Sequence, residues 1–127
     1  MLEFDQYRLT LSKCEQPIRD LEKSLDLENK KNRIIELNAA MEDPNFWNDP
    51  DKSTKTVKEA KNLKDAVDEF EKLRTDYEDA QMMIDMADEE GDLSMVDEIA
   101  GMVAGITDTI EMMKVRTLLS DQYDDSN

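Results

Sequence analysis

Carboxylates are the most abundant chemically active groups in this sequence. Of the 127 residues, 32 are Asp or Glu and 16 are Lys or Arg, which gives a formal net charge of -16. The densest acidic run, residues 88–92, resembles a calcium-binding loop. An EF-hand loop, however, needs glycine at its sixth position and glutamate at its twelfth. Counted from Asp88, these positions hold Leu93 and Ile99, so the run does not predict a calcium site.

The groups that would make these carboxylates catalytic are missing from the sequence. There is no histidine, which excludes a histidine base, a histidine metal ligand and the usual di-iron Glu-x-x-His bundle. Carboxylates catalyse when they are desolvated and paired in a pocket, whereas these follow solvent-facing helical positions. There is also no glycine-rich phosphate loop and no Ser or Cys paired with a base. We therefore predict no enzyme, no cofactor and no metal site.

Three further features each allow two interpretations. Cys14, the single cysteine, lies on an apolar stripe and fits either a core position or a reactive thiol. Phe46-Trp47 fits an aromatic plug that closes the end of a bundle, or a recognition hot spot. The methionines fit either core packing or an adaptable binding groove. The most suggestive of them are Met82, Met83, Met86, Met95, Met102, Met112 and Met113.

Charge is distributed unevenly along the chain. Residues 52–64 hold five lysines and one acid, whereas residues 75–113 hold twelve acids and no base. The acidic residues Asp88, Glu89, Glu90 and Asp92 fit either a solvated helix face or a tip that docks a partner. Because nucleic-acid affinity depends on Lys and Arg, the overall charge predicts no direct nucleic-acid binding. The lone cysteine, the lack of a secretory signal and the lack of a long apolar run predict a cytoplasmic protein without a membrane span.

Helical periodicity extends through almost the whole sequence and predicts the elements that carry these groups. The first stripe has heptad spacing and contains Tyr7, Leu11, Cys14, Ile18, Leu21 and Leu25. Pro17 within it predicts a kink or a fresh helix start near residues 14–17. The phase of the pattern then changes, which predicts a break at Leu25-Asp26 with Asp26 as the cap of the next helix.

The strongest loop signal, residues 43–50, separates the first helices from a long one. Asp49-Pro50 predicts the N-cap and the first residue of that helix. Gly91 is predicted to be the residue that follows its end. An apolar stripe from Val57 to Ala87 lies along this helix, which spans about 60 Å from Pro50 to Gly91 at helical rise. Ser94 to Asp97 offers a capping box for a last helix whose stripe extends to Leu118, and residues 120–127 are expected to be extended or disordered.

These elements predict an all-α fold, an elongated antiparallel helical bundle with coiled-coil character and three to four helices. The short connection at Gly91 requires antiparallel neighbours. Residues 1–119 form the predicted helical domain, and residues 120–127 form a polar tether.

Three stretches together resemble the N-terminal region of the bacterial peptide chain release factor 2 family. They are residues 25–33 (LDLENKKNR), 41–49 (MEDPNFWND) and 116–124 (RTLLSDQYD). The resemblance covers essentially the whole chain. The most specific parts are Trp47 in its Asp/Asn/Pro loop and the terminal Leu-Leu-Ser-x-x-Tyr-Asp pattern.

The resemblance implies a factor that directs translation termination at UGA and UAA on the bacterial ribosome. The family's Ser-Pro-Phe and Gly-Gly-Gln motifs do not occur in these 127 residues. The chain is therefore expected to be a docking module of a longer factor, without the part that triggers peptidyl-tRNA hydrolysis. The implied partners, besides the ribosome, are the stalk-base proteins and the release-factor GTPase. The alternative is a free-standing acidic coiled-coil adaptor or chaperone-like protein.

Overall fold

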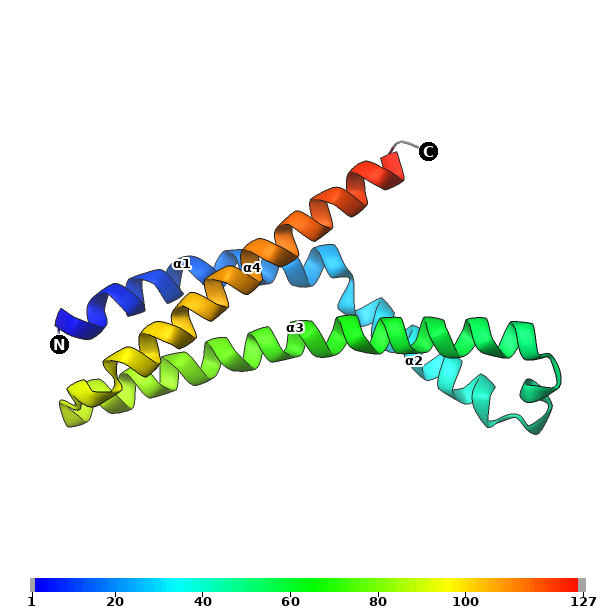
Figure 1. Ribbon diagram of the computed structural model, residues 1–127, viewed down its shortest axis with the longest axis horizontal. Coiled ribbons are helices and arrows are strands. Elements are labelled where there is room, and N and C mark those ends of the chain that lie inside the picture. Colours follow the sequence, from blue (N-terminus) through cyan, green and yellow to red (C-terminus); the bar gives the residue numbers. More distant parts are fainter. Residues whose placement is uncertain (1, 126–127) are drawn as a thin grey trace. The chain divides into compact units, whose positions relative to one another are not determined.

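The computed structural model describes residues 2–125, with side-chain positions for residues 2–122. All regular structure in this range is helical, which confirms the predicted all-α class (Figure 1). In chain order, the elements are α1 (Leu2–Leu25), α2 (Leu27–Glu42), the 3-10 helix η1 (Pro44–Asn48), α3 (Pro50–Glu90), the 3-10 helix η2 (Leu93–Met95) and α4 (Val96–Asp125). None of the helices in this range is both long enough and apolar enough to cross a lipid bilayer.

The chain divides into two compact units, and the division falls within α3. The first unit contains α1, the part of α3 from Lys72 onward and α4. The second unit contains Asp26, α2, η1 and the part of α3 up to Glu71. Each unit has its own buried apolar side chains.

The first unit is a three-helix arrangement built on the predicted heptad stripe of α1. That stripe is confirmed, since Leu11, Cys14, Ile18 and Leu21 are all buried. It begins one step earlier than predicted, because Phe4 is fully buried. Phe4 lies one heptad before Leu11, and this spacing could have identified it. The α3 and α4 residues that complete this core are Leu73, Ala80, Ile84, Ala87, Ile99, Val103, Ile106, Ile110 and Met113.

Pro17 does not restart the first helix, contrary to one of the two expectations. α1 is continuous from Leu2 to Leu25 with Pro17 inside it. The predicted break at Asp26 is confirmed, since Asp26 adopts the left-handed conformation with φ of 51°. Its side chain makes no capping bond to the backbone. Instead, the backbone carbonyl of Asp26 accepts a hydrogen bond from the amide of Lys30 at 3.1 Å, which is the first hydrogen bond of α2. The left-handed backbone of Asp26 thus separates α1 from α2.

The ends of the long helix α3 agree with the sequence prediction. At its start, the Asp49 carboxylate accepts from the amide of Lys52 at 3.2 Å. At its end, Gly91 has a φ of 65°. The amide of Asp92 donates to the carbonyl of Ala87 at 2.8 Å, which is the 6→1 bond of a Schellman C-cap. A side chain at Gly91 would be strained, because left-handed backbone is unfavourable for other residues.

Three predictions for the last helix were wrong. Ser94 does not cap α4, because it lies within η2 and its amide donates to the carboxylate of Asp92 at 3.0 Å. The segment 120–125 is helical rather than extended, because no glycine or proline follows Gly105 to stop α4. Residues 126–127 of the predicted tether lie outside the described residues. Leu118, expected on the buried stripe, is 62% exposed.

The second unit has a smaller apolar core and a prominent ion pair. Leu27 and Leu37 of α2 and Val67 and Phe70 of α3 are buried. Arg33 of α2 donates through Nε to one carboxylate oxygen of Glu59 at 2.8 Å and through Nη2 to the other at 3.2 Å. This two-point hydrogen bond lowers the pKa of the Glu59 carboxyl and raises the pKa of Arg33.

The Arg33–Glu59 pair should make stability depend on pH in acid. Because the folded pKa of Glu59 is lowered, its contribution is complete above the unfolded pKa and disappears as the pH falls through the folded pKa. Glu59→Gln should therefore destabilise the protein at neutral pH and have no effect well below pH ~4. Urea unfolding of both proteins over a pH series measures this. In an Arg33→Gln background, Glu59→Gln should leave the free energy of unfolding unchanged at both neutral and acid pH. If Glu59→Gln still destabilised the otherwise wild-type protein in acid, the pH dependence could not come from the Arg33–Glu59 pair.

Candidate docking site

The predicted acidic tip lies where α3 ends and the chain turns into η2 and α4. Gly91 reverses the chain, and the Asp92 carboxylate holds the first turn of η2. In the last turns of α3, two carboxylates accept hydrogen bonds from Arg8 of α1. Arg8 donates through Nη1 to Asp85 at 2.9 Å and through Nη2 to Asp88 at 2.8 Å. The end of α3 is therefore fixed to α1 by a forked contact.

The four acids predicted to dock a partner have different surroundings. The side chain of Asp88 is only 21% exposed and is paired with Arg8. Asp92 serves as the cap of η2. Glu89 and Glu90 are exposed. Two of the four residues thus build the turn, and two present their carboxylates to solvent.

Exposed methionines lie on the same stretch of α3 as these two glutamates. Met82 is 59% exposed and Met86 is 55% exposed. The two are four residues apart, and Glu89 and Glu90 follow Met86 by three and four residues, so all four share one helix face. We call these four residues the Met–Glu strip. Sequence periodicity alone could not separate exposed from core methionines: Met113 is buried, whereas Met112 is 48% exposed.

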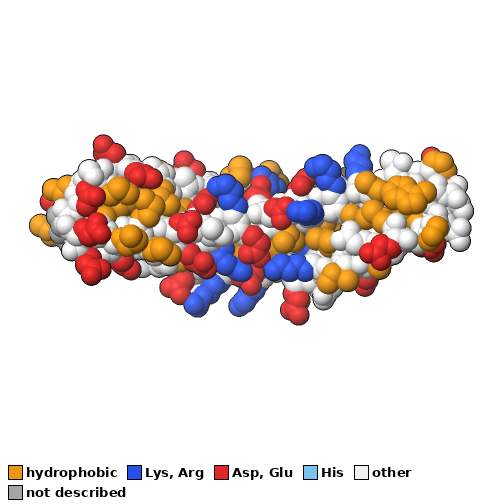
Figure 2. All heavy atoms as spheres, turned by 90° about the horizontal axis from the view of Figure 1, so that it is seen from below, with side chains coloured by type: hydrophobic (Ala, Val, Ile, Leu, Met, Phe, Trp, Pro, Cys, Tyr) orange, Lys and Arg blue, Asp and Glu red, His pale blue; other side chains and the backbone are white. Residues whose placement is uncertain are grey.

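Apolar surface surrounded by acids is a suitable match for a basic and apolar protein surface. Figure 2 shows hydrophobic side chains lying among carboxylates at one end of the molecular surface. Methionine adapts its shape to different partners because its side chain is unbranched and polarisable. The carboxylates add steering of a cationic partner and selectivity against an anionic one.

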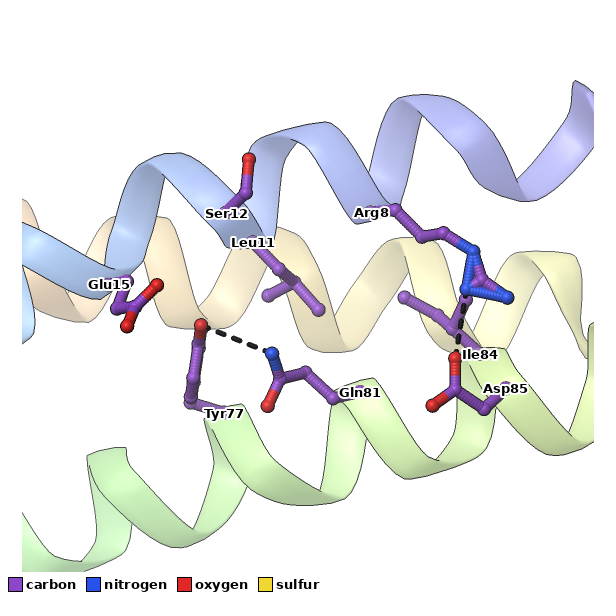
Figure 3. A pocket seen from close by; sticks show the side chains of 8 residues that line it. All are labelled: Arg8, Leu11, Ser12, Glu15, Tyr77, Gln81, Ile84 and Asp85. Atoms are coloured by element: carbon purple, nitrogen blue, oxygen red, sulfur yellow. Dashed lines mark hydrogen bonds and ion pairs between the residues drawn. The ribbon is translucent and has the colours of Figure 1, made fainter.

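A groove between α1 and α3 lies next to the Arg8 fork (Figure 3). Its volume is about 380 Å³. Leu11 and Ile84 point into the space between the two helices, and Gln81 donates to the Tyr77 hydroxyl at 3.2 Å. Burial, followed by the nearby Glu15 carboxylate, raises the pKa of Tyr77. The Ser12 hydroxyl donates to the Leu9 carbonyl at 2.7 Å, so within this groove it is not activated by a base.

Cys14 belongs to the core, which confirms the first of its two interpretations. Its side chain is 5% exposed, and burial raises the pKa of its thiol while Lys114 partly opposes the shift. A raised pKa leaves less of the nucleophilic thiolate at neutral pH. Among the described side chains, no group of three or more His, Cys, Asp or Glu is arranged to hold a metal ion.

The comparison with known families matches most of the chain. The PCRF domain model matches residues 30–127. The chain belongs to the PCRF domain family. This agrees with the resemblance noted in the sequence, and the match contains the loop with Phe46-Trp47 and the end of α3.

Individual relatives extend the similarity to the whole chain. It is 32% identical over 127 residues to peptide chain release factor 2 of Petrotoga mobilis, covering 100% of this chain and 34% of the relative. It is 32% identical over 126 residues to that of Listeria innocua, covering 99% and 34%. Over 127 residues it is 28% identical to that of Clostridium perfringens, covering 100% and 35%. The chain thus spans about a third of the length of these curated relatives.

Proposed function

We propose that this chain is the PCRF part of a peptide chain release factor and serves as its docking module in translation termination at UGA and UAA. The observation that carries the proposal is the similarity of the whole chain to proteins named peptide chain release factor 2. The free-standing adaptor is not favoured, because the chain matches the PCRF domain and the relatives reported above are named release factors. In this proposal the decoding and peptidyl-tRNA hydrolysis steps belong to the remaining two thirds of the factor, and the factor acts in the cytoplasm.

The Met–Glu strip is the surface proposed to dock a protein partner. Support comes from the exposure of Met82 and Met86 and from the exposed carboxylates of Glu89 and Glu90. The Arg8 fork to Asp85 and Asp88 supports it further, because a fixed helix end loses little conformational entropy on binding. The proposed partners are the basic surfaces of the stalk-base proteins or of the release-factor GTPase.

Reversing the two exposed charges should weaken docking without affecting ester hydrolysis. In a full-length factor that contains this chain, Glu89→Lys with Glu90→Lys should slow association with the stalk or the GTPase about tenfold, because steering charges act mainly on the association rate. Stopped-flow association and single-turnover peptide release at saturating factor measure the two effects separately.

A matched control has the same change in charge elsewhere in the first unit. Asp108→Lys with Glu111→Lys alters two exposed residues of α4 and should leave association within about twofold of wild type at physiological salt, where charge effects decay with a screening length of ~8 Å. The docking proposal is wrong if the Glu89 and Glu90 changes abolish peptide release at saturating factor, or if the control slows association equally.

A further inference from the structure

The second unit exposes a groove lined by Trp47 and two lysines, and none of its lining residues belongs to the Met–Glu strip. It lies between η1 and the first turns of α3 and has a volume of about 440 Å³. It is lined by Trp47, Ser53, Thr54, Val57, Lys58 and Lys61. Positions 54, 57, 58 and 61 have the spacing of a single helix face. The groove therefore consists of one face of α3 with the indole of Trp47 beside it.

The apolar walls of this groove are exposed to solvent. Trp47 is 56% exposed and Val57 is 40% exposed. The exposure of Trp47 does not fit the first of its two interpretations, a closing plug, and Val57 was expected on the buried stripe. Phe46 is half-buried, and its ring meets the Trp47 ring edge-to-face with the ring centroids 4.7 Å apart. This contact orients the indole of Trp47 while more than half of its surface stays exposed to solvent. An exposed, pre-positioned tryptophan is typical of a binding hot spot.

Positive charge borders these apolar walls. Residues 52–64 contain five lysines and one acid, Glu59, and that acid is paired with Arg33. Lys61 pairs with Asp65 at 2.7 Å. Within the described side chains, Lys52, Lys55 and Lys58 have no ion-pair partner. This strip is thus locally cationic in a chain whose net charge is -16.

We propose that this groove binds an acidic protein segment, which inserts one aliphatic or aromatic side chain between Trp47 and Val57 and places a carboxylate against Lys58. The lysine stem covers apolar surface while its ammonium group meets the carboxylate. Nucleic acid fits less well, because a polyphosphate needs many cationic contacts and would be repelled by the rest of this acidic chain. The inference goes beyond the termination role and does not depend on it.

A peptide array probed with the full chain, labelled at its amino terminus, tests the proposal. The peptides vary in acidic content and in one central residue. The chain should retain peptides that combine Asp or Glu with a central Leu, Ile or Phe, and should not retain those with a central Ser. Trp47 is the only tryptophan, so its emission should shift to shorter wavelength as a retained peptide is titrated in.

Two charge reversals on the same helix distinguish a direct contact between a lysine and the peptide from a long-range effect of the chain's charge. Lys58→Glu should weaken binding about tenfold, because it places a like charge in the contact. Lys55→Glu changes the charge equally but lies outside the groove lining, and should change affinity by no more than about threefold at physiological salt. Equal losses from the two variants would overturn the proposal.

Other occupants give distinct results in the same assay. A single-stranded oligouridine that bound more tightly than every acidic peptide would identify RNA as the occupant. A shift of Trp47 emission with protein concentration alone, matched by growing mass in light scattering, would identify a second copy of this chain. Either result would overturn the proposal, as would an array in which acidic peptides are retained no better than neutral ones.

Discussion

Phe70→Ala should lower the free energy of unfolding by about 3–5 kcal/mol. Phe70 lies on α3 in the second unit and is 0% exposed, so truncation removes its apolar contacts and leaves a cavity that the helices only partly fill. This unit buries few apolar residues, and no second aromatic side chain in it is fully buried among those described. Loss of Phe70 should therefore affect the whole second unit.

Urea unfolding followed by circular dichroism measures this change. The matched control is Ile35→Ala in the same unit, because Ile35 is 66% exposed and should change stability by no more than about 0.5 kcal/mol. The midpoint should fall with little change in slope if unfolding stays cooperative. Equal effects of the two substitutions would mean that Phe70 is not a core residue.

Ile84→Ala should lower the free energy of unfolding by about 2–5 kcal/mol. Ile84 is 1% exposed and points between α1 and α3, next to the Arg8 fork (Figure 3). Its loss should loosen the end of α3 that presents the Met–Glu strip. Docking should then weaken as well, because the surface is no longer held in one conformation before binding.

The neighbouring Met86→Ala separates stability from docking. Met86 is two residues along the same helix but 55% exposed, so its truncation should change stability by no more than about 0.5 kcal/mol. It should still weaken partner binding if the Met–Glu strip is the docking surface. Thermal unfolding and stopped-flow association on both variants measure the two effects. A large stability loss with Met86→Ala would contradict the assigned orientation of this helix.

The sequence predicted the helices, both ends of α3 and the buried stripe of the first unit well, because these depend on local signals. Gly91 ends α3 with positive φ, and Asp49 caps its start, as their residue types indicate. Heptad spacing identified Leu11 and Cys14 as core residues because a regular stripe must pack against another helix.

The sequence could not predict which positions of each apolar stripe are covered by another helix and which stay exposed. Val57 and Leu118 have the correct period for a core position, yet both are exposed. Periodicity gives the direction of a side chain on its own helix, whereas burial depends on whether another helix covers that position. The same limit applies to Met82 and Met86, and to Trp47, whose exposure depends on how η1 folds back against α3.

The proposed role in termination is tested most directly by peptide release from a chimeric factor. In the Listeria innocua relative, the matching third is replaced by this chain, and release of peptide is measured on ribosomes stalled at UGA, UAA and UAG. We expect release at UGA and UAA close to that of the unaltered relative, with none above background at UAG, whereas a variant lacking this region should be slower. A folded chimera that releases peptide no faster than the deletion variant would contradict the proposed function.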